Sequence, residues 1–247
     1  MYKYKINKQL NSDFTDFILN IKNFFVDNTQ TIHKARNELK IIEHNGINTI
    51  VKSFKIPNFI NQIAYSYFRD SKAKRSYEHS LLIEQFTPKA IGYIEFYSAS
   101  LLKESYFVSE KFDYDFTIRE PLFQDGFEDK EEILKAFARF TLELHNSDVF
   151  HFDYSPGNIL IKKENGIYTF KIVDINRMKF FKLSEIDRAK NFSKLWADEE
   201  SLRIIGEEYS KHHNCKGDFV KQLIELTASD KKTKSMKKNI KKTLLRK

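Results

Sequence analysis

The sequence predicts an α+β protein of two lobes, a strand-rich first lobe followed by a reduced, helical second lobe. Runs typical of β-strands dominate the chain up to residues 110–115, and helical spacing of apolar residues dominates beyond that point. The length of 247 residues suits one compact domain or two small lobes that share a cleft. Hydrophobic residues make up 41% of the chain, which is enough for packed cores and excludes a disordered protein.

The first lobe reads as helix, hairpin, helix, hairpin. Apolar residues recur every three or four positions in 10–28, which predicts a helix. Two strand-like runs, 38–44 and 47–54, flank Asn45-Gly46, a dipeptide typical of tight hairpin turns. The remaining elements of this lobe are expected at 71–86 (helix), 89–97 and 104–112 (strands).

The second lobe begins with an amphipathic helix, which apolar spacing predicts over 129–146. A short apolar run leads into the polar segment 151–158, and two short strands, 158–162 and 170–174, follow it. Beyond Leu183 the pattern is helical. We therefore expect a first lobe over 1–112, a second lobe over 113–230 and a basic tail over 231–247.

The net charge of +8 is concentrated in that tail. Nine of the 42 basic residues lie from Lys231 onward, where there is no acidic residue, so the rest of the chain carries 33 basic against 34 acidic side chains. Such a run is typical of a segment that contacts an anionic membrane surface. The roughly helical spacing of Met236, Ile240, Leu244 and Leu245 allows a short amphipathic anchor. A solvated, frayed tail is the alternative reading.

The sequence indicates a cytoplasmic protein. Its first residues lack the apolar core of a signal peptide, and no apolar run approaches the ~18 residues of a membrane span. One cysteine, Cys215, cannot form an internal disulfide, which fits a reducing compartment. The basic tail adds the expectation of peripheral contact with the inner face of the cytoplasmic membrane.

Three polar residues in the second lobe have the spacing of a phosphotransfer site. Asp153 and Asn158 lie five residues apart across a turn that contains Pro156-Gly157, so both can face one cleft. Asp153 is the candidate base that orients an attacking hydroxyl. Asn158, through its amide oxygen, and Asp174, at the end of an apolar strand, are the candidate Mg²⁺ ligands.

A lysine in the first lobe completes the pattern. Ile50, Lys52 and Phe54 share one face of a strand. Because that face buries Ile and Phe, a lysine on it indicates a functional role. Lys52 is the candidate contact to the ATP phosphates, and Glu78 on the following helix is its candidate partner, because a buried ammonium needs one. Lys55 and Glu84 compete for these roles.

These residues resemble the protein-kinase-like superfamily, and within it the lipopolysaccharide kinase (Kdo/WaaP) family. The resemblance covers about residues 30–210 and implies a bilobal protein-kinase-like fold, with ATP and Mg²⁺ as cofactors. It also implies that the acceptor is a sugar hydroxyl, of Kdo or heptose, in the lipopolysaccharide inner core on lipid A. The segments that carry it are 51–55, 71–78, 151–160 and 173–178.

The sequence departs from the superfamily pattern in ways that bear on the substrate. No Gly-rich phosphate loop is present; the corresponding turn is 33–37, where Arg36, or Lys34, would supply side-chain charge. Ser155 stands where Ser/Thr protein kinases have a lysine, and its hydroxyl would meet the γ-phosphate. No Ala-Pro-Glu follows Asp174, and little chain remains for a peptide-docking platform, so a glycolipid acceptor fits better than a protein.

A second group of basic residues lies at the start of a predicted helix, and two alternative functions use the residues described above differently. The cluster Arg69, Lys72, Lys74 and Arg75 opposes the dipole at a helix start, which favours contact with phosphate over a merely solvated face. A Ser/Thr protein kinase or autokinase would keep the same three site residues. A non-catalytic module that binds nucleic acid through the tail leaves those residues unexplained, and we expect no nucleic-acid partner.

Overall fold

A computed structural model describes residues 1–29, 31–34, 37–54, 58–215 and 217–244. The chain divides into two compact units. The first unit contains Met1–Asp113 and Asp174–Asn176, and the second contains Tyr114–Val173 and Arg177–Lys247. The short segment Asp174–Asn176 therefore belongs to the first unit, although the chain on both sides of it belongs to the second.

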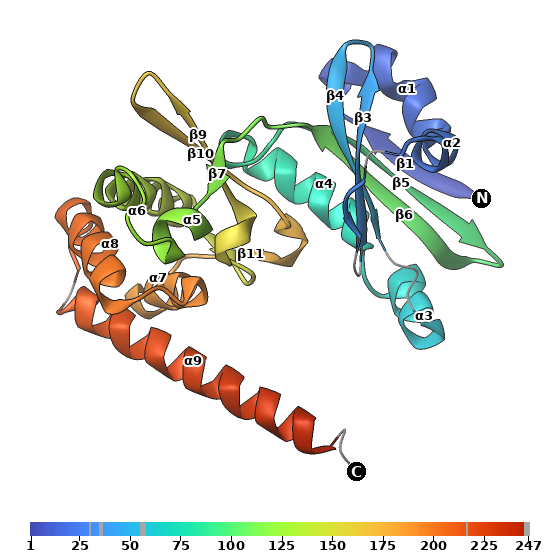
Figure 1. Cartoon of the computed structure of the whole chain (residues 1–247). Helices are drawn as coiled ribbons and strands as arrows, with labels where there is room; N and C mark the ends of the chain where they lie inside the picture. Colours follow the sequence, from blue (N-terminus) through green and yellow to red (C-terminus); the bar gives the residue numbers. More distant parts are fainter. Residues whose placement is uncertain (30, 35–36, 55–57, 216, 245–247) are drawn as a thin grey trace. The chain divides into compact units, whose positions relative to one another are not determined.

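The first unit is built on an antiparallel sheet, six-stranded within the described residues, with the order β1-β5-β6-β4-β3-β2 (Figure 1). The turn between β3 and β4 contains Asn45 at φ 52° and Gly46 at φ 76°. Positive φ at both positions is what a tight two-residue hairpin requires, which confirms the hairpin predicted from this dipeptide. The strands of this sheet are β1 (Tyr2–Ile6), β2 (Thr31–Lys34), β3 (Asn37–His44), β4 (Ile47–Phe54), β5 (Ala90–Ser98) and β6 (Leu101–Glu110).

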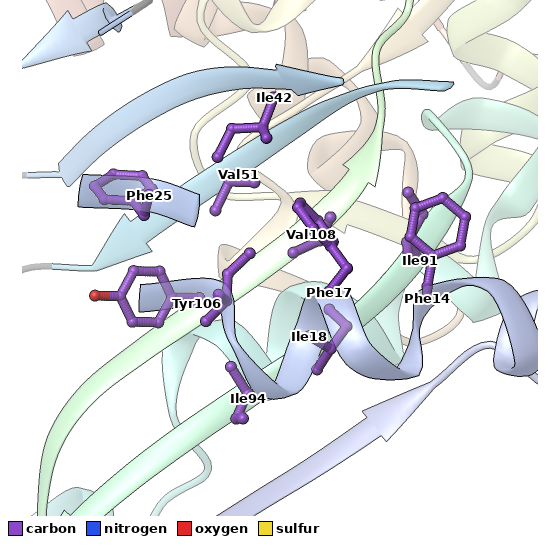
Figure 2. Packing of buried hydrophobic residues seen from close by; sticks show 11 residues of the cluster. Phe14, Phe17, Ile18, Phe25, Ile42, Val51, Ile91, Ile94, Tyr106 and Val108 are labelled. Atoms are coloured by element: carbon purple, nitrogen blue, oxygen red, sulfur yellow. The ribbon is translucent and has the colours of Figure 1, made fainter. Parts of the chain in front are cut away.

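Helices cover both faces of this sheet. On one face, α1 (Asn11–Leu19) and α2 (Ile21–Asp27) pack a cluster of buried aromatic and aliphatic side chains against the strands (Figure 2). On the other face, α4 (Lys72–Leu82) packs Ala73 and Tyr77 against Phe54 and Tyr93. Alternation along β4 explains the two faces, because Val51 points to the first cluster and Phe54 to the second.

Three features of the first unit differ from the sequence expectation. The helix predicted over 10–28 is two helices, interrupted at Asn20. The edge strand β1 and the helix α3 (Phe59–Tyr67) were not predicted.

Helix α4 begins where it was expected, because the Ser71 hydroxyl accepts a hydrogen bond from the Lys74 amide at 3.0 Å.

The second unit is mainly helical, with two small sheets. The predicted helix over 129–146 is α6, which buries an apolar face that includes Ile133, Leu134 and Phe137. The predicted strands form the hairpin β9–β10, which β7 extends, while β8 pairs with β11. The elements are β7 (Phe116–Thr117), α5 (Arg119–Phe123), α6 (Lys130–Asn146), β8 (Val149–His151), β9 (Ile159–Glu164), β10 (Ile167–Ile172), β11 (Met178–Phe180), α7 (Glu185–Phe192), α8 (Glu199–His212) and α9 (Phe219–Leu244).

The basic tail is the end of a long helix. Helix α9 packs its first turns on α7 and α8 and continues through Lys231 to Leu244 (Figure 1). Its middle is fixed by Asp230, which accepts hydrogen bonds from the Trp196 indole and the Lys194 ammonium. Across the described part of the chain, no helix combines the length and the apolar character needed to cross a bilayer.

Candidate functional site

The predicted catalytic loop follows β8 and is organised by His151. The Asp153 amide donates to His151 Nδ1 at 3.0 Å, and His151 Nε2 lies 3.2 Å from the Val173 carbonyl. Because Nδ1 accepts a hydrogen bond, the ring proton must be on Nε2, which then donates to Val173. A neutral, fully buried imidazole therefore joins the start of the loop to the end of β10.

The same loop brings Asp153 and Asn158 together. The Asn158 side-chain amide donates to the Asp153 carbonyl at 2.8 Å, and the Asn158 backbone amide donates to the Ser155 carbonyl at 2.9 Å. Pro156 opens the short 3-10 turn Pro156–Asn158, which closes this arrangement. Because the Asn158 nitrogen is engaged inside the loop, its amide oxygen is directed away from that bond, as a ligand to a cation would need.

The Asp153 carboxylate is open to solvent. Its side chain is 42% exposed, and Arg177 Nη1 lies 3.9 Å from its Oδ2. Ser155 is half-buried and precedes the 3-10 turn. A carboxylate that solvent can reach has the access that the predicted base for a substrate hydroxyl needs.

A buried polar network that the sequence did not predict holds His151, at the start of the loop, in place. Asn191 donates to the His151 carbonyl at 2.8 Å and accepts from the His151 amide at 3.4 Å. Its oxygen also accepts from His145 Nε2 at 3.1 Å, and the Tyr209 hydroxyl donates to His145 Nδ1 at 2.9 Å. Burial lowers the pKa of His145 to about 3, so this imidazole is neutral. The buried Arg188 guanidinium donates to the Tyr209 hydroxyl at 2.8 Å and brings a positive charge to the network. Its only sequence signal is a histidine near the apolar stripe of α6.

In the first unit the structure brings Lys52 and Asp174 together. Lys52 Nζ lies 2.7 Å from Asp174 Oδ1, and the side chains are 14% and 30% exposed. The Asn176 amide donates to the same oxygen at 2.6 Å. Asp174 has φ 58°, a left-handed conformation that is uncommon outside glycine and is often found at functional positions.

The predicted pairing of Lys52 with Glu78 is wrong in this structure. Within the described residues, the ion pair of Lys52 is with Asp174, whereas Glu78 lies 3.8 Å from Lys74. The reason is the orientation of α4: Tyr77 packs into the core, which turns the next residue, Glu78, towards solvent.

A histidine on α4 contacts the Asp174 segment instead. His79 Nδ1 lies 2.7 Å from the Ile175 carbonyl, and burial lowers the pKa of His79. Of the competing residues, Glu84 is exposed at the start of a short 3-10 turn, and Lys55 lies outside the described residues, as does Arg36.

The basic cluster at the start of α4 is partly neutralised. Lys74 Nζ lies 2.6 Å from Asp70 Oδ1, and this hydrogen bond raises the pKa of Lys74. Arg69 and Lys74 line a cavity of about 370 Å³ together with the buried Glu95 and the ring of Tyr93. The cluster therefore faces carboxylates of the protein as well as solvent.

The two predicted Mg²⁺ ligands lie in different units, and each carries a donor group suited to a hard divalent cation. Asp174 supplies carboxylate oxygen and Asn158 amide oxygen, both of which Mg²⁺ prefers. Among the residues that the structure describes, no group of three or more His, Cys, Asp or Glu side chains could hold a metal ion. Each predicted ligand therefore fits Mg²⁺ by the chemistry of its own donor atoms.

Comparison with known proteins gives structural relatives only. No family model and no curated protein matches the sequence. A structure of WaaP in complex with acyl carrier protein matches with a TM-score of 0.59 and 14% identity, over 93% of this chain and 98% of that chain. The kinase PK-1 of Cydia pomonella granulovirus matches with a TM-score of 0.47 and 11% identity, over 79% of this chain and 74% of that chain. The chain therefore has the α+β protein-kinase-like fold predicted from its sequence, and its resemblance to the lipopolysaccharide kinase (Kdo/WaaP) family is confirmed at the level of the fold.

Proposed function

We propose that this protein is an ATP-dependent kinase that phosphorylates a sugar hydroxyl, of Kdo or heptose, in the lipopolysaccharide inner core on lipid A. The observation that carries the proposal is the loop of the second unit, in which Asp153 and Asn158 are tied together by a 2.8 Å hydrogen bond and anchored through the buried His151. A kinase-like fold with this loop supports phosphotransfer as the reaction class.

Each site residue has one role in the proposed reaction. The oxygen of the acceptor hydroxyl attacks the γ-phosphorus of ATP while Asp153 accepts the hydroxyl proton, and ADP leaves. Lys52 binds phosphate oxygens, while Asp174 and Asn158 are the residues that would hold Mg²⁺. Bound Mg²⁺ supplies charge neutralisation on the phosphates. Contacts of Arg36 and Ser155 to phosphate remain predictions from the sequence.

The structure around Asp174 favours a non-peptide acceptor. In protein kinases a long activation loop follows the corresponding aspartate and helps to position the peptide. Here the strand β11 begins at Met178 and helix α7 at Glu185, so no long loop follows Asp174. The structural match covers 98% of the WaaP chain, which supports the same proposal because WaaP shares this arrangement over nearly its whole length.

Two partners follow as proposals. The WaaP structure was solved with acyl carrier protein, so a carrier protein of this kind is a partner to test by co-purification. The basic end of α9 is proposed to contact an anionic membrane surface, which would keep the enzyme on the inner face of the cytoplasmic membrane.

The direct test is incubation of the protein with ATP, Mg²⁺ and Kdo-lipid A, followed by mass analysis of the lipid. We expect a mass gain of one phosphate, which chelation of Mg²⁺ abolishes. Intact-mass analysis of the protein in the same reaction tests the autokinase alternative. Phosphate on a protein and none on any core sugar would overturn the proposed acceptor.

A further inference from the structure

The two-stranded sheet β8–β11 carries aromatic and basic side chains on its outer face. His151 and Met178 lie opposite each other in this sheet, and both are buried. Because side chains alternate along a strand, the cross-strand pair Phe150 and Lys179 lies on the opposite face of the sheet from His151 and Met178. We define the Phe152 patch as Phe150, Phe152, Arg177, Lys179 and Phe181.

The three rings and the lysine of the Phe152 patch lie close together. The Phe150 ring lies 4.9 Å from the Phe152 ring and 6.0 Å from the Phe181 ring, and the Lys179 ammonium lies 5.5 Å from the Phe152 ring. Phe150 forms the buried floor, whereas Phe152 is 47% and Phe181 39% exposed. Grouped exposed rings of this kind mark an interaction surface.

This patch borders the proposed base. Phe152 directly precedes Asp153, and its amide donates to the Arg177 carbonyl at 3.0 Å. The Arg177 guanidinium lies 3.9 Å from the Asp153 carboxylate. Whatever binds the patch therefore lies next to the group that would receive the hydroxyl proton.

The charge of the patch selects an anionic partner. Residues 175–184 contain Arg177, Lys179 and Lys182, all exposed, and no acidic residue. A free anion would need only the cations. Exposed phenylalanine rings beside the cations match a partner that offers both anionic groups and hydrocarbon.

We propose that the Phe152 patch docks on an anionic lipid bilayer, an inference that rests on the proposed function for its substrate. Phenylalanine rings enter the boundary between headgroups and acyl chains, while lysine and arginine keep their charges among the lipid phosphates. Asp153 then lies at the depth where the sugars of a membrane-held glycolipid are found. This docking presents the acceptor hydroxyl to the base without a peptide platform.

The test compares matched double variants of the full chain in flotation with vesicles of phosphatidylglycerol and phosphatidylcholine. The patch variant is Lys179→Glu with Phe181→Ser. The control variant is Lys190→Glu with Phe123→Ser, which changes a lysine and a phenylalanine that are also exposed in the second unit. We expect at least about tenfold weaker binding of the patch variant to anionic vesicles, little binding of any protein to neutral vesicles, and no effect of the control. Thermal unfolding shows that each variant folds.

Equal binding by the patch and control variants would overturn the inference. So would loss of binding only in a variant with Lys232→Glu and Lys237→Glu, because the contact would then belong to α9. Binding of an acidic carrier protein instead of vesicles would assign the patch to a protein partner.

Transfer to a delipidated sugar acceptor separates this inference from the proposed function. If the patch variant keeps that transfer and loses transfer to vesicle-held acceptor, both stand. If transfer to every sugar fails while vesicle binding still depends on the patch, only the proposed function falls.

Discussion

The two units hold their functional side chains by different physical means. In the second unit, buried hydrogen bonds between neutral groups hold the predicted catalytic loop, with Asn191 making two of them to His151. In the first unit, an ion pair that water can reach joins Lys52 to Asp174, and a more exposed pair joins Lys74 to Glu78.

The difference indicates which part is preformed. Buried neutral hydrogen bonds have fixed geometry and do not respond to salt, so the loop has its shape before any ligand binds. An accessible ion pair can exchange one partner for another, such as a phosphate. We infer that the second unit provides a rigid scaffold, and that under the proposed function the charges of the first unit rearrange when a nucleotide binds.

The largest expected effect comes from removing the base. Asp153→Asn should lower the rate of phosphate transfer by about 10³-fold, within the range for loss of a general base, because an amide cannot accept the hydroxyl proton. Nucleotide affinity and stability should change little, since the contact of this carboxylate to Arg177 is exposed. Asp174→Asn is the matched control, and it should instead weaken Mg²⁺-dependent nucleotide binding. Near-full activity of Asp153→Asn would show that the base is elsewhere.

Removal of the buried clamp should destabilise the second unit. Asn191→Ala leaves the buried backbone of His151 and the ring of His145 without their partner, which should cost about 3 kcal/mol of unfolding free energy. Chemical denaturation measures this loss. Asn214→Ala changes an exposed asparagine of the same unit and should stay within about 0.5 kcal/mol of the unaltered protein. Equal stability of the two variants would contradict the inference that buried hydrogen bonds make the second unit a rigid scaffold.

Mild acid should also weaken the network, because His145 is held neutral. Its folded pKa, about 3, lies below the unfolded value of 6.5, so the unfolded chain binds the proton first as pH falls. Stability is therefore lost as pH falls below about 6.5, by about 2 kcal/mol from this group at pH 5. Unfolding measured at pH 8 and pH 5 should show a smaller loss in His145→Gln. An equal loss in both proteins would mean that other groups dominate.

The smallest effect is expected in the first unit. Glu78→Gln removes the half-buried, 3.8 Å pair with Lys74 and should change stability by less than about 0.5 kcal/mol. Transfer activity should be close to that of the unaltered protein, because Lys52 is paired with Asp174. A loss of activity of more than about tenfold, with unchanged stability, would show that Glu78 takes over Lys52 when nucleotide binds.

Local signals in the sequence predicted local structure well. The Asn45-Gly46 hairpin and α6 follow from turn chemistry and from apolar spacing within single segments. The loop from Asp153 to Asn158 is also local, and the structure closes it with a hydrogen bond from the Asn158 side chain to the Asp153 backbone carbonyl.

Features that depend on distant segments were missed. The strand β1 is mostly exposed and exists because it pairs with β5, about ninety residues away along the chain. Asn191 lies forty residues from His151, and nothing in its own segment distinguishes it from a surface asparagine. The partner of Lys52 depends on how α4 is rotated, which the packing of Tyr77 decides rather than the charge of Glu78.

The assignment of Asp174–Asn176 to the first unit has a consequence for inheritance and engineering. A fragment that ends at Asp113 would contain Lys52 and the whole large sheet but would lack Asp174. The gene segment for the second unit, in turn, encodes three residues that belong to its neighbour. Because the two units are interleaved in this way, neither can be exchanged as one contiguous stretch of sequence, and recombination must carry both together to preserve the Lys52–Asp174 pair.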